Sequence, residues 1–541
     1  MVPTSPIRRF TALAIVMAVV GSFLLVLPPT RGYAAQEWTE PQDLSAISPY
    51  LKNPAVAISA DGRRQTAVWT TLEEGARVTQ AVSSSDSGLS WSDPVNLSDS
   101  NPSFEAETAQ IVSSADGLTL TAIWSYPGFE EGFSADSSQS ATSADVGSGR
   151  GLSGGPSQSA TSADVGSEVA FPAGPIQSAS STDGGATWSA PVDISSSTEW
   201  SLGPQLTGSA DGSKVTAVWM GFDTDTFLSD VLGAVSEDGG LTWSAATQLS
   251  AGGPDSDSYA PHVAISDDGS RITAVWDRFD GSNYIVQSRT STDGGMSWGN
   301  PVDHSAAGSE GWNARVTSSA DGNHLTIAWK YLDGEDWITQ VSSSSNGGTS
   351  WGATKDLSAT GGDAGNPLIT GSDNGNRVTV LWKRDDESSE VAQTASTTDG
   401  GATWGAPVDL SQPGGDVDDP QIASTEDGRG LTVVWDRNDG LVEATSSTDA
   451  GASWSGPVAV SNSSGRGPVV ASSANGTALT TVWQHYDGSE YVVRAASLVA
   501  PGVGIAPQAK SFGEVAVGSQ AGPAAITVTN DGNAPLSVSA V

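Results

Sequence analysis

Two repeats and a lack of helical periodicity predict an all-β chain that folds as an eight-bladed β-propeller of four-stranded antiparallel blades. The first repeat reads S-x-D-x-G-x-[ST]-W, as in Ser291–Trp298, and recurs at about 50-residue spacing. The second repeat places Gly after Asp or Asn, with Thr four residues later and Trp seven residues later. Four-stranded antiparallel sheets repeated around an axis form a propeller. No stretch after residue 34 shows the helical period.

The first repeat, here called the aspartate turn, has the chemistry of a hairpin turn. Asp-Gly and Gly-Gly reach positive φ at low cost, and Asp and Ser side chains bond their own turn backbone. We expect its Trp to open the next strand as a large, mostly buried apolar anchor. The seven copies contain Asp86 and Trp91, Asp183 and Trp188, Asp238 and Trp243, Asp293 and Trp298, Asn346 and Trp351, Asp399 and Trp404, and Asp449 and Trp454.

The second repeat predicts a tight turn followed by a β-branched, apolar strand such as Thr273–Trp276. Each repeat unit therefore contains four strands, A to D in chain order. In the fourth unit we expect strand A at 261–265, strand B ending at Trp276, strand C at 284–290 and strand D from Trp298. The eight Trp residues of this repeat are Trp69, Trp124, Trp219, Trp276, Trp329, Trp382, Trp435 and Trp483.

The N-terminus supplies the strand that the repeats lack. There are eight A–B units but only seven aspartate turns. Trp38–Ser45 matches Trp404–Ser411, the start of a strand D, in residue type and spacing. We therefore predict that this segment is strand D of the eighth blade, beside strand C near 491–497. Closing the ring in this way leaves no free sheet edge.

The aspartate turns resemble the Asp-boxes, or BNR repeats, of sialidase-type β-propellers, and the resemblance covers residues 37–500. It implies structural turns on the blade rim, away from any active site. Asp-boxes also occur in propellers that catalyse nothing, and the catalytic sialidases of this family have six blades.

The enzyme question stays open at this point, and the residues favour a non-catalytic protein. The resemblance implies that a sialidase needs an acid/base carboxylate, a Tyr nucleophile activated by Glu, and three arginines, the first in an F/Y-R-I-P motif. The first strand A here reads Asn53–Val56 and contains no Arg, and Arg315 is the one basic residue expected in any strand A. No catalytic residue is therefore predicted.

Candidate ligand-binding residues lie on the face opposite the two shared turns, in the D–A and B–C connections. Aromatic rings can stack on sugars, and Arg can donate hydrogen bonds to them. The alternatives are extra packing for the aromatic residues and solvated ion pairs for the arginines. The candidates are Trp200, Trp312, Trp337, Tyr259, Tyr331, Tyr486, Arg278, Arg384 and Arg437.

Three functions follow as hypotheses. The first is an exported, sialidase-like propeller that binds glycans or extracellular proteins as a non-catalytic adhesion module of a bacterial-type cell. The alternatives are an exo-glycosidase of sialidase type and a structural spacer in a larger surface protein.

Composition narrows the partners. The formal net charge of −39 makes nucleic acids and anionic membranes unfavourable binding partners, because they are negatively charged as well. The chain has no cysteine, which excludes thiol catalysis. No cofactor or metal is predicted. Calcium at acidic segments such as Asp223–Asp225, Asp255–Asp257 and Asp416–Asp419 is the open alternative to solvated loops.

Three segments lie outside the repeats. Residues 1–34 read as a signal peptide, because Arg8 and Arg9 precede an apolar run. We therefore predict that the protein is secreted or held at the cell surface. After removal of the signal we expect a monomeric propeller that does not insert into a membrane. Residues 128–174 are a Ser- and Gly-rich insertion in the second blade, expected to be disordered. Residues 501–541 resemble the start of an ASH-type immunoglobulin-like domain, and a partial domain predicts a fragment.

Overall fold

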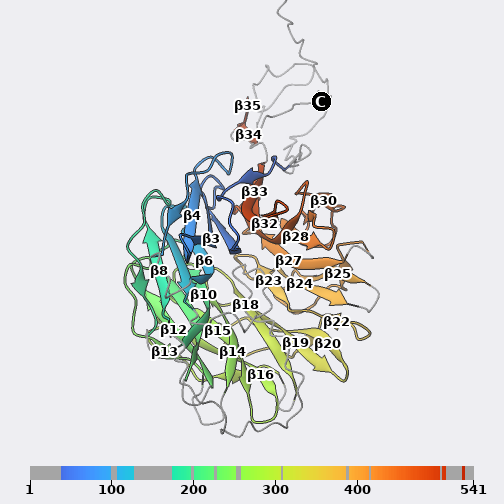
Figure 1. The fold of residues 1–541 in the computed structure, drawn as a ribbon. Helices are drawn as coiled ribbons and strands as arrows, with labels where there is room; N and C mark the ends of the chain where they lie inside the picture. Colours follow the sequence, from blue (N-terminus) through green and yellow to red (C-terminus); the bar gives the residue numbers. More distant parts are fainter. Residues whose placement is uncertain are drawn as a thin grey trace, which may run out of the picture. The chain divides into compact units, whose positions relative to one another are not determined.

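A computed structural model of the chain describes residues 38–98, 106–126, 174–196, 200–223, 228–250, 257–305, 309–385, 389–412, 416–499, 503–506 and 527–530. These residues form strands and no helix, so the predicted all-β class is confirmed. One compact unit, Gln36–Val499, contains eight antiparallel sheets arranged around a central axis (Figure 1). The predicted eight-bladed propeller is therefore confirmed. Within the described residues, no helix is long and apolar enough to cross a membrane.

The strands of the first four blades follow one another in the order A to D. Blade 1 contains β2 (Leu51–Ile58), β3 (Gln65–Glu73), β4 (Ala76–Ser84) and β5 (Val95–Asn96), and blade 2 contains β6 (Glu107–Ser113), β7 (Leu120–Ser125), β8 (Ile176–Ser181) and β9 (Val192–Asp193). Blade 3 contains β10 (Trp200–Gly208), β11 (Val215–Phe222), β12 (Ser229–Ser236) and β13 (Thr247–Gln248), and blade 4 contains β14 (Ser258–Ile265), β15 (Ile272–Phe279), β16 (Tyr284–Ser291) and β17 (Val302–Asp303).

Blades 5 to 8 repeat this order, except that strand A of blade 6 is split in two. Blade 5 contains β18 (Gly311–Ser318), β19 (Leu325–Asp333), β20 (Asp336–Ser344) and β21 (Lys355–Asp356), and blade 6 contains β22 (Asp363–Ala364) with β23 (Leu368–Gly371), β24 (Val378–Asp385), β25 (Glu390–Thr397) and β26 (Val408–Asp409). Blade 7 contains β27 (Val417–Ser424), β28 (Leu431–Arg437), β29 (Val442–Ser447) and β30 (Val458–Ala459), and blade 8 contains β31 (Gly465–Ser472), β32 (Ala478–Tyr486), β33 (Tyr491–Val499) and β1 (Gln42–Asp43).

The N-terminal strand closes the ring as predicted. In blade 8, β1 pairs with β33 through Gln42↔Ala495 and Asp43↔Arg494, and Trp38 pairs with Leu498. The first and last blades of the propeller thus lie side by side, with β3 and β4 next to β32 and β33 (Figure 1).

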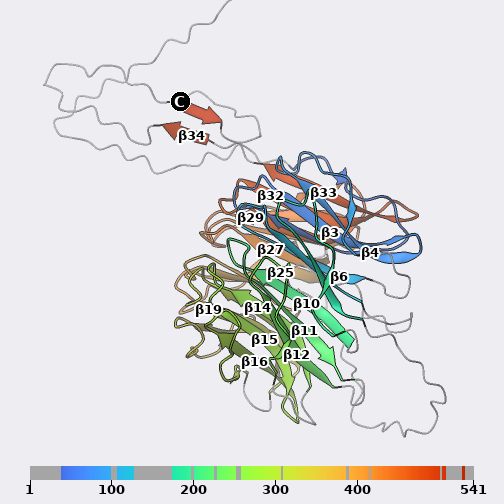
Figure 2. The same ribbon diagram turned by 90° about the vertical axis from the view of Figure 1, so that its left-hand side faces the viewer.

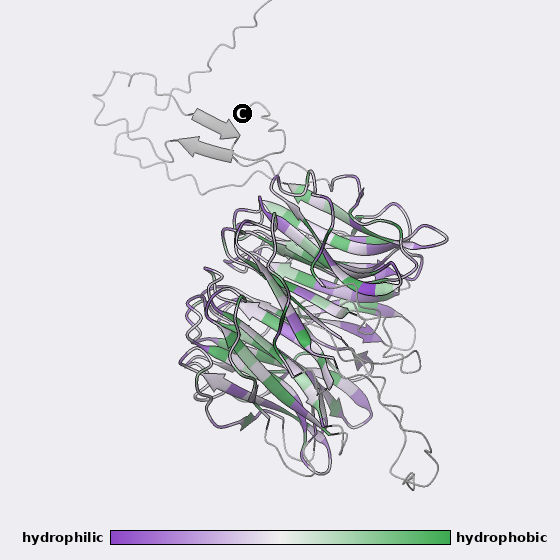
Figure 3. Ribbon diagram, turned by 60° about the vertical axis from the view of Figure 1, so that its left-hand side comes forward, coloured by the Kyte–Doolittle hydropathy of each residue, from purple (hydrophilic) through white to green (hydrophobic). Residues whose placement is uncertain are grey.

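The core consists of eight apolar clusters, one between each pair of adjacent blades. Each contains one strand-B tryptophan with no exposed surface; Trp276 of blade 4, for example, packs on Val218, Val231 and Leu249 of blade 3. Figure 2 shows the strands of these two blades side by side, with β11 and β12 next to β14 and β15. Figure 3 shows the hydrophobic residues concentrated in the strands and the hydrophilic ones in the loops between them. The strand-B tryptophans are therefore the main apolar anchors.

The aspartate-turn tryptophans are mostly buried, as expected, but less completely than the strand-B tryptophans. Trp298 lies at the margin of the same cluster and keeps a minor part of its surface exposed, and its six counterparts and Trp38 are placed alike. The reason is that strand D does not begin at Trp298 but at Val302, and pairs over two residues only. The turn tryptophan therefore lies in a loop at the rim, with one face open.

The aspartate turn itself is held by hydrogen bonds to one carboxylate. Ser181 Oγ donates to Asp183 Oδ1 at 2.8 Å, and Thr187 donates through its backbone N at 2.9 Å and through its Oγ1 at 2.6 Å. These bonds, with those from Thr187 the largest, lower the pKa of Asp183 to about 2. In blade 5 the amide of Asn346 makes the corresponding bonds, so the turn requires hydrogen-bond geometry rather than charge.

Both kinds of shared turn lie on one face of the propeller, here called the turn face. The fourth residue of each aspartate turn shows this, because its backbone N donates to the A–B turn of the same blade; Gly294 N, for example, donates to Ser270 O at 2.9 Å, and Ser87 and Ala450 take this position in blades 1 and 7. The A–B turns also bond one another in a closed circle of eight backbone N–H···O bonds of 2.7–3.0 Å. The residues of this circle are Ala60, Ala115, Ala210, Asp267, Ala320, Asp373, Glu426 and Ala474.

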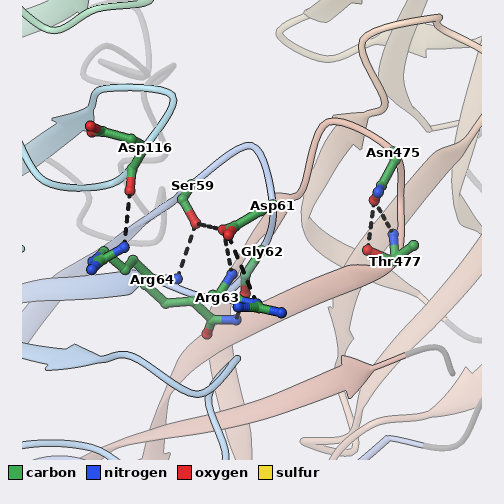
Figure 4. A network of polar contacts seen from close by, with 9 residues as sticks. Ser59, Asp61, Gly62, Arg63, Arg64, Asp116, Asn475 and Thr477 are labelled. Carbon is green, nitrogen blue, oxygen red and sulfur yellow. Dashed lines mark hydrogen bonds and ion pairs between the residues drawn. The ribbon is translucent and has the colours of Figure 1, made fainter. Parts of the chain in front are cut away.

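Basic side chains fasten neighbouring turns on this face. Arg64 of blade 1 reaches the carbonyl oxygen of Asp116 in blade 2 at 3.4 Å (Figure 4). Lys214 of blade 3 lies over Gly269 of blade 4, where a Cβ would come within 2.5 Å of the Lys214 Cδ. Gly269 has φ of 69°, so both the turn and the packing require glycine there. The opposite face, here called the loop face, carries the D–A and B–C connections.

Outside the propeller, β34 (Val503–Ala506) and β35 (Thr527–Asn530) pair antiparallel. The predicted signal peptide, the insertion at 128–174 apart from Gly174, and the rest of the predicted immunoglobulin-like segment lie outside the described residues.

Candidate functional site

The A strands surround the axis, and seven of them carry a β-bulge near the loop face. At each bulge one residue has positive φ, such as Asn313 with 56° in blade 5. Below the bulges the axis contains a cavity of about 170 Å³, lined mostly by aliphatic side chains with His262 and Gln421. Ligand pockets usually measure about 300–1,000 Å³, so this cavity suits water rather than a ligand.

The loop face of blades 4 and 5 gathers three of the predicted aromatic residues. Tyr259 lies in β14, Trp312 in β18 and Trp337 at the start of β20. Each is partly exposed. With Tyr284 they are here called the aromatic site.

Tyr284 connects the two blades within this site. Its ring centroid lies 4.1 Å from that of Trp312 and 5.7 Å from that of Tyr259. Phe279 pairs with Tyr284 across strands β15 and β16, and the centroids of the two rings lie 5.3 Å apart. The bulge in β18 places Trp312 at this position, because two residues there oppose one on β19.

Asp257 anchors the tyrosine hydroxyls. Its Oδ2 accepts hydrogen bonds from Tyr259 at 2.7 Å and from Tyr284 at 3.3 Å, and its Oδ1 accepts one from buried Ser229 at 2.6 Å. Burial and the nearby carboxylate raise the pKa of Tyr259 to about 12, and they raise the pKa of Tyr284 as well. Both hydroxyls therefore stay protonated at neutral pH and act as hydrogen-bond donors.

Charged groups surround the two tryptophans. Trp312 Nε1 donates to Glu310 Oε1 at 3.0 Å. Lys330, which pairs in register with Trp312, places its Nζ 4.3 Å from the centre of the Trp337 ring. Burial lowers the pKa of Lys330, against the opposing effect of the Asp363 and Glu310 carboxylates. The site thus combines exposed ring faces with both donors and acceptors.

Buried Asp277 fixes the backbone beneath Trp312. It extends from β15 of blade 4, and its Oδ2 accepts a hydrogen bond from the Asn313 backbone N at 2.7 Å. Asp277 has no exposed surface, and burial raises its pKa to about 7. This contact between blades holds the positive-φ bulge that orients Trp312.

The other candidate residues are spread over six blades, and of these only Arg278 and Tyr331 belong to blades 4 and 5. Arg278, Arg384 and Arg437 belong to blades 4, 6 and 7; Arg384 donates to Gly361 O at 3.1 Å, and Arg437 pairs with Glu443 at 3.0 Å, each within its own blade. Tyr331 packs on the apolar cluster between blades 4 and 5. Trp200 lies in blade 3, and Tyr486 in blade 8.

Sequence reasoning missed Tyr284, Asp257 and Lys330. Tyr284 lies within an expected strand C, Lys330 directly follows the Trp329 that ends an expected strand B, and Asp257 was considered only as a calcium ligand. The signal that could have identified Tyr284 is its position as the first residue of strand C, directly opposite Phe279. It also missed that strand A begins before the bulge, so the strands include Lys52 and Arg466, and the expectation of Arg315 as the one basic residue was wrong.

Stability should fall as the pH rises from about 4 to 8, because Asp277, Asp436 and Asp373 have raised pKa values of about 7, 7 and 6. Burial is the main cause, and at Asp373 the carboxylate of Glu426 adds to it. A folded state that retains protons which the unfolded state releases loses stability with rising pH. The aspartate turns, whose pKa values are lowered, reverse this trend only below about pH 4.

Asp373→Ala isolates one of these carboxylates, because five of the eight positions in the backbone circle are already Ala. Calorimetry at several pH values should show a flatter melting profile than that of the parent between about pH 5 and 8. An unchanged slope would assign the pH dependence to other groups.

The described residues contain no group of three or more His, Asp or Glu side chains placed to hold a metal ion. Asp225 and Asp255, which belong to the predicted calcium segments, lie outside the described residues.

No protein-family model and no curated protein matches this chain. Among solved structures, an ulvan lyase of the polysaccharide lyases is similar over 79% of this chain and 98% of its own, at 11% identity and a TM-score of 0.46. An α-L-arabinanase from Penicillium chrysogenum covers 55% of this chain and 93% of its own, at 14% identity and a TM-score of 0.36. A Trypanosoma rangeli sialidase covers 55% of this chain and 54% of its own, at 14% identity and a TM-score of 0.33. At these values the likeness assigns no activity.

Proposed function

We propose that the loop face of this propeller binds glycans without cleaving them, as an adhesion or recognition module outside the cell. The observation that carries the proposal is the aromatic site, in which Trp312 stacks on Tyr284 at 4.1 Å while its ring stays partly exposed. The C–H faces of sugar rings are apolar, so a fixed aromatic surface covers them at low entropic cost. Asp257, Glu310 and Lys330 surround that surface with groups able to bond sugar hydroxyls.

The tyrosine chemistry supports binding more than cleavage. A Tyr nucleophile must lose its proton, whereas the pKa of Tyr259 is raised to about 12. Arg384 and Arg437 already bond groups of their own blades, the Gly361 carbonyl oxygen and the Glu443 carboxylate, so these two arginines do not support a pocket for a sugar carboxylate. An exo-glycosidase is therefore the second choice.

Trp312→Ala should weaken retention on glycans by about tenfold or more, which corresponds to about 1.4 kcal/mol. The melting temperature should change by less than about 2 °C, because Trp312 is a surface residue outside the eight core clusters. A glycan array probed with the parent and the variant measures the first effect, and calorimetry measures the second. Trp200→Ala is the matched control, since Trp200 lies near the start of a strand A, as Trp312 does, but in blade 3.

Three outcomes contradict parts of the proposal. Equal binding by the parent and Trp312→Ala would make Trp312 a packing residue. No binding by the parent to any glycan would favour a protein ligand or a spacer. Release of fluorophore from a sialic-acid aryl glycoside between about pH 4 and 8, abolished by Asp257→Asn, would establish the glycosidase.

A further inference from the structure

The residues that precede the β-bulges form the rim of the axial opening on the loop face. In blades 4 and 5 these residues are Tyr259 and Trp312, and in blades 8 and 1 they are Arg466 and Lys52. Eight blades share one axis, so blades four positions apart lie opposite each other. The aromatic pair therefore faces a cationic pair across the opening.

A second group of aromatic residues lies on the cationic side. Tyr486 is 41% exposed, and its ring centroid lies 5.1 Å from that of Tyr491. Tyr491 exchanges two backbone hydrogen bonds of 2.9 Å with Ser48, in the segment that leads from β1 to Tyr50. Ser48 lies two residues before Tyr50, so ring closure brings this segment beside Tyr491; Tyr50, Tyr486 and Tyr491 are here called the tyrosine patch.

Cations lie directly against this patch. The Arg77 guanidinium is 4.2 Å, and Lys52 Nζ is 5.3 Å, from the centre of the Tyr50 ring. Arg466, the rim residue of blade 8, is exposed. The B–C turns that lead to Arg77 and that join Tyr486 to Tyr491 also carry Glu73, Glu74, Asp487 and Glu490, so the patch offers two individual cations against Tyr50 rather than a broad positive field. Each of these cations can form a charge-assisted hydrogen bond with an anionic sugar group.

We infer that the tyrosine patch is a second subsite, which takes an acidic group of a linear glycan whose other part lies on the aromatic site. This inference rests on the proposed function and extends it to the ligand class. A ligand joined across both subsites binds the second one at high effective concentration, so its affinity rises with chain length once it spans the opening. A short or neutral glycan occupies the aromatic site alone.

The test measures binding of length-fractionated oligosaccharides to the full chain by calorimetry. The probes are oligogalacturonates as carboxylates, sulfated dextran oligomers as sulfates and unmodified dextran oligomers as the neutral series. The variant is Lys52→Gln with Arg466→Gln. Its control is Arg63→Gln with Arg429→Gln, which changes the net charge equally but on the turn face, where both residues belong to A–B turns.

For the parent, at least one acidic series should gain tenfold or more in affinity above a threshold length, whereas the neutral series should not. The loop-face variant should lose this gain while binding short oligomers as the parent does, and the control should keep it. An equal gain with neutral oligomers, no gain with length, or an equal loss in the control would overturn the inference. If short oligomers still bind in a Trp312-dependent way, the proposed function survives that result; if no oligomer binds the parent, both fail.

Discussion

Trp276→Ala should lower the free energy of unfolding by about 3–5 kcal/mol, one of the two largest effects expected in this chain. Trp276 has no exposed surface and fills the space between blades 3 and 4, against Val218, Val231 and Leu249. The substitution removes its apolar contacts and leaves a cavity that strands on both sides cannot close, because each is held in its own sheet. The measurement is the denaturant midpoint and the melting temperature of parent and variant.

Trp298→Ala is the matched control, because Trp298 packs on the same cluster from the rim and keeps one face exposed. It should cost about 1–2 kcal/mol, in proportion to its smaller buried area. Equal losses in the two variants would contradict the assignment of the strand-B tryptophans as the main anchors.

Removing residues 37–48 should destabilise the propeller by several kcal/mol and cause aggregation. The deletion takes Trp38 from the cluster between blades 7 and 8 and Leu44 from the cluster between blades 8 and 1. It also exposes the edge of β33, whose backbone bonds to residues such as Leu44, at 2.8 Å, are lost. Calorimetry and light scattering measure the two effects.

Two comparisons make this deletion decisive. Asp43→Asn removes only the Asp43–Arg494 ion pair, which is partly exposed, and should cost about 0–1 kcal/mol. A synthetic peptide of residues 37–48, added to the truncated protein, should raise its melting temperature because it replaces the missing strand. A truncated protein that melts like the parent would show that the ring is stable without β1.

The sequence predicted the fold from local chemistry. Asp-Gly turns, β-branched strands and their spacing act within a few residues, so eight A–B units and the match between Trp38–Ser45 and Trp404–Ser411 were enough for eight blades and for the closing strand. The expectation that strand D begins at Trp298 was wrong for the same reason. A turn motif contains no information about how far the next strand pairs, and strand D pairs over only two residues.

The candidate site was predictable only in part. Tyr259, Trp312 and Trp337 stand out in the sequence because they interrupt the repeat, and the structure places them together. Tyr284, Asp257 and Lys330 do not stand out, since their role depends on which blade lies beside which and on the bulge that turns Trp312 toward Tyr284.

The sequence by itself determined the blade count, the two shared turns and the order of strands, because these depend on short-range backbone preferences that repeat along the chain. The tertiary structure alone decided which tryptophans are buried, and which residues of the A strands face each other across the axis. Lys52 and Arg466 are 414 residues apart in the chain, and only the closed ring places their strands, β2 and β31, side by side. Contacts of that kind arise from packing between blades, which no local pattern encodes.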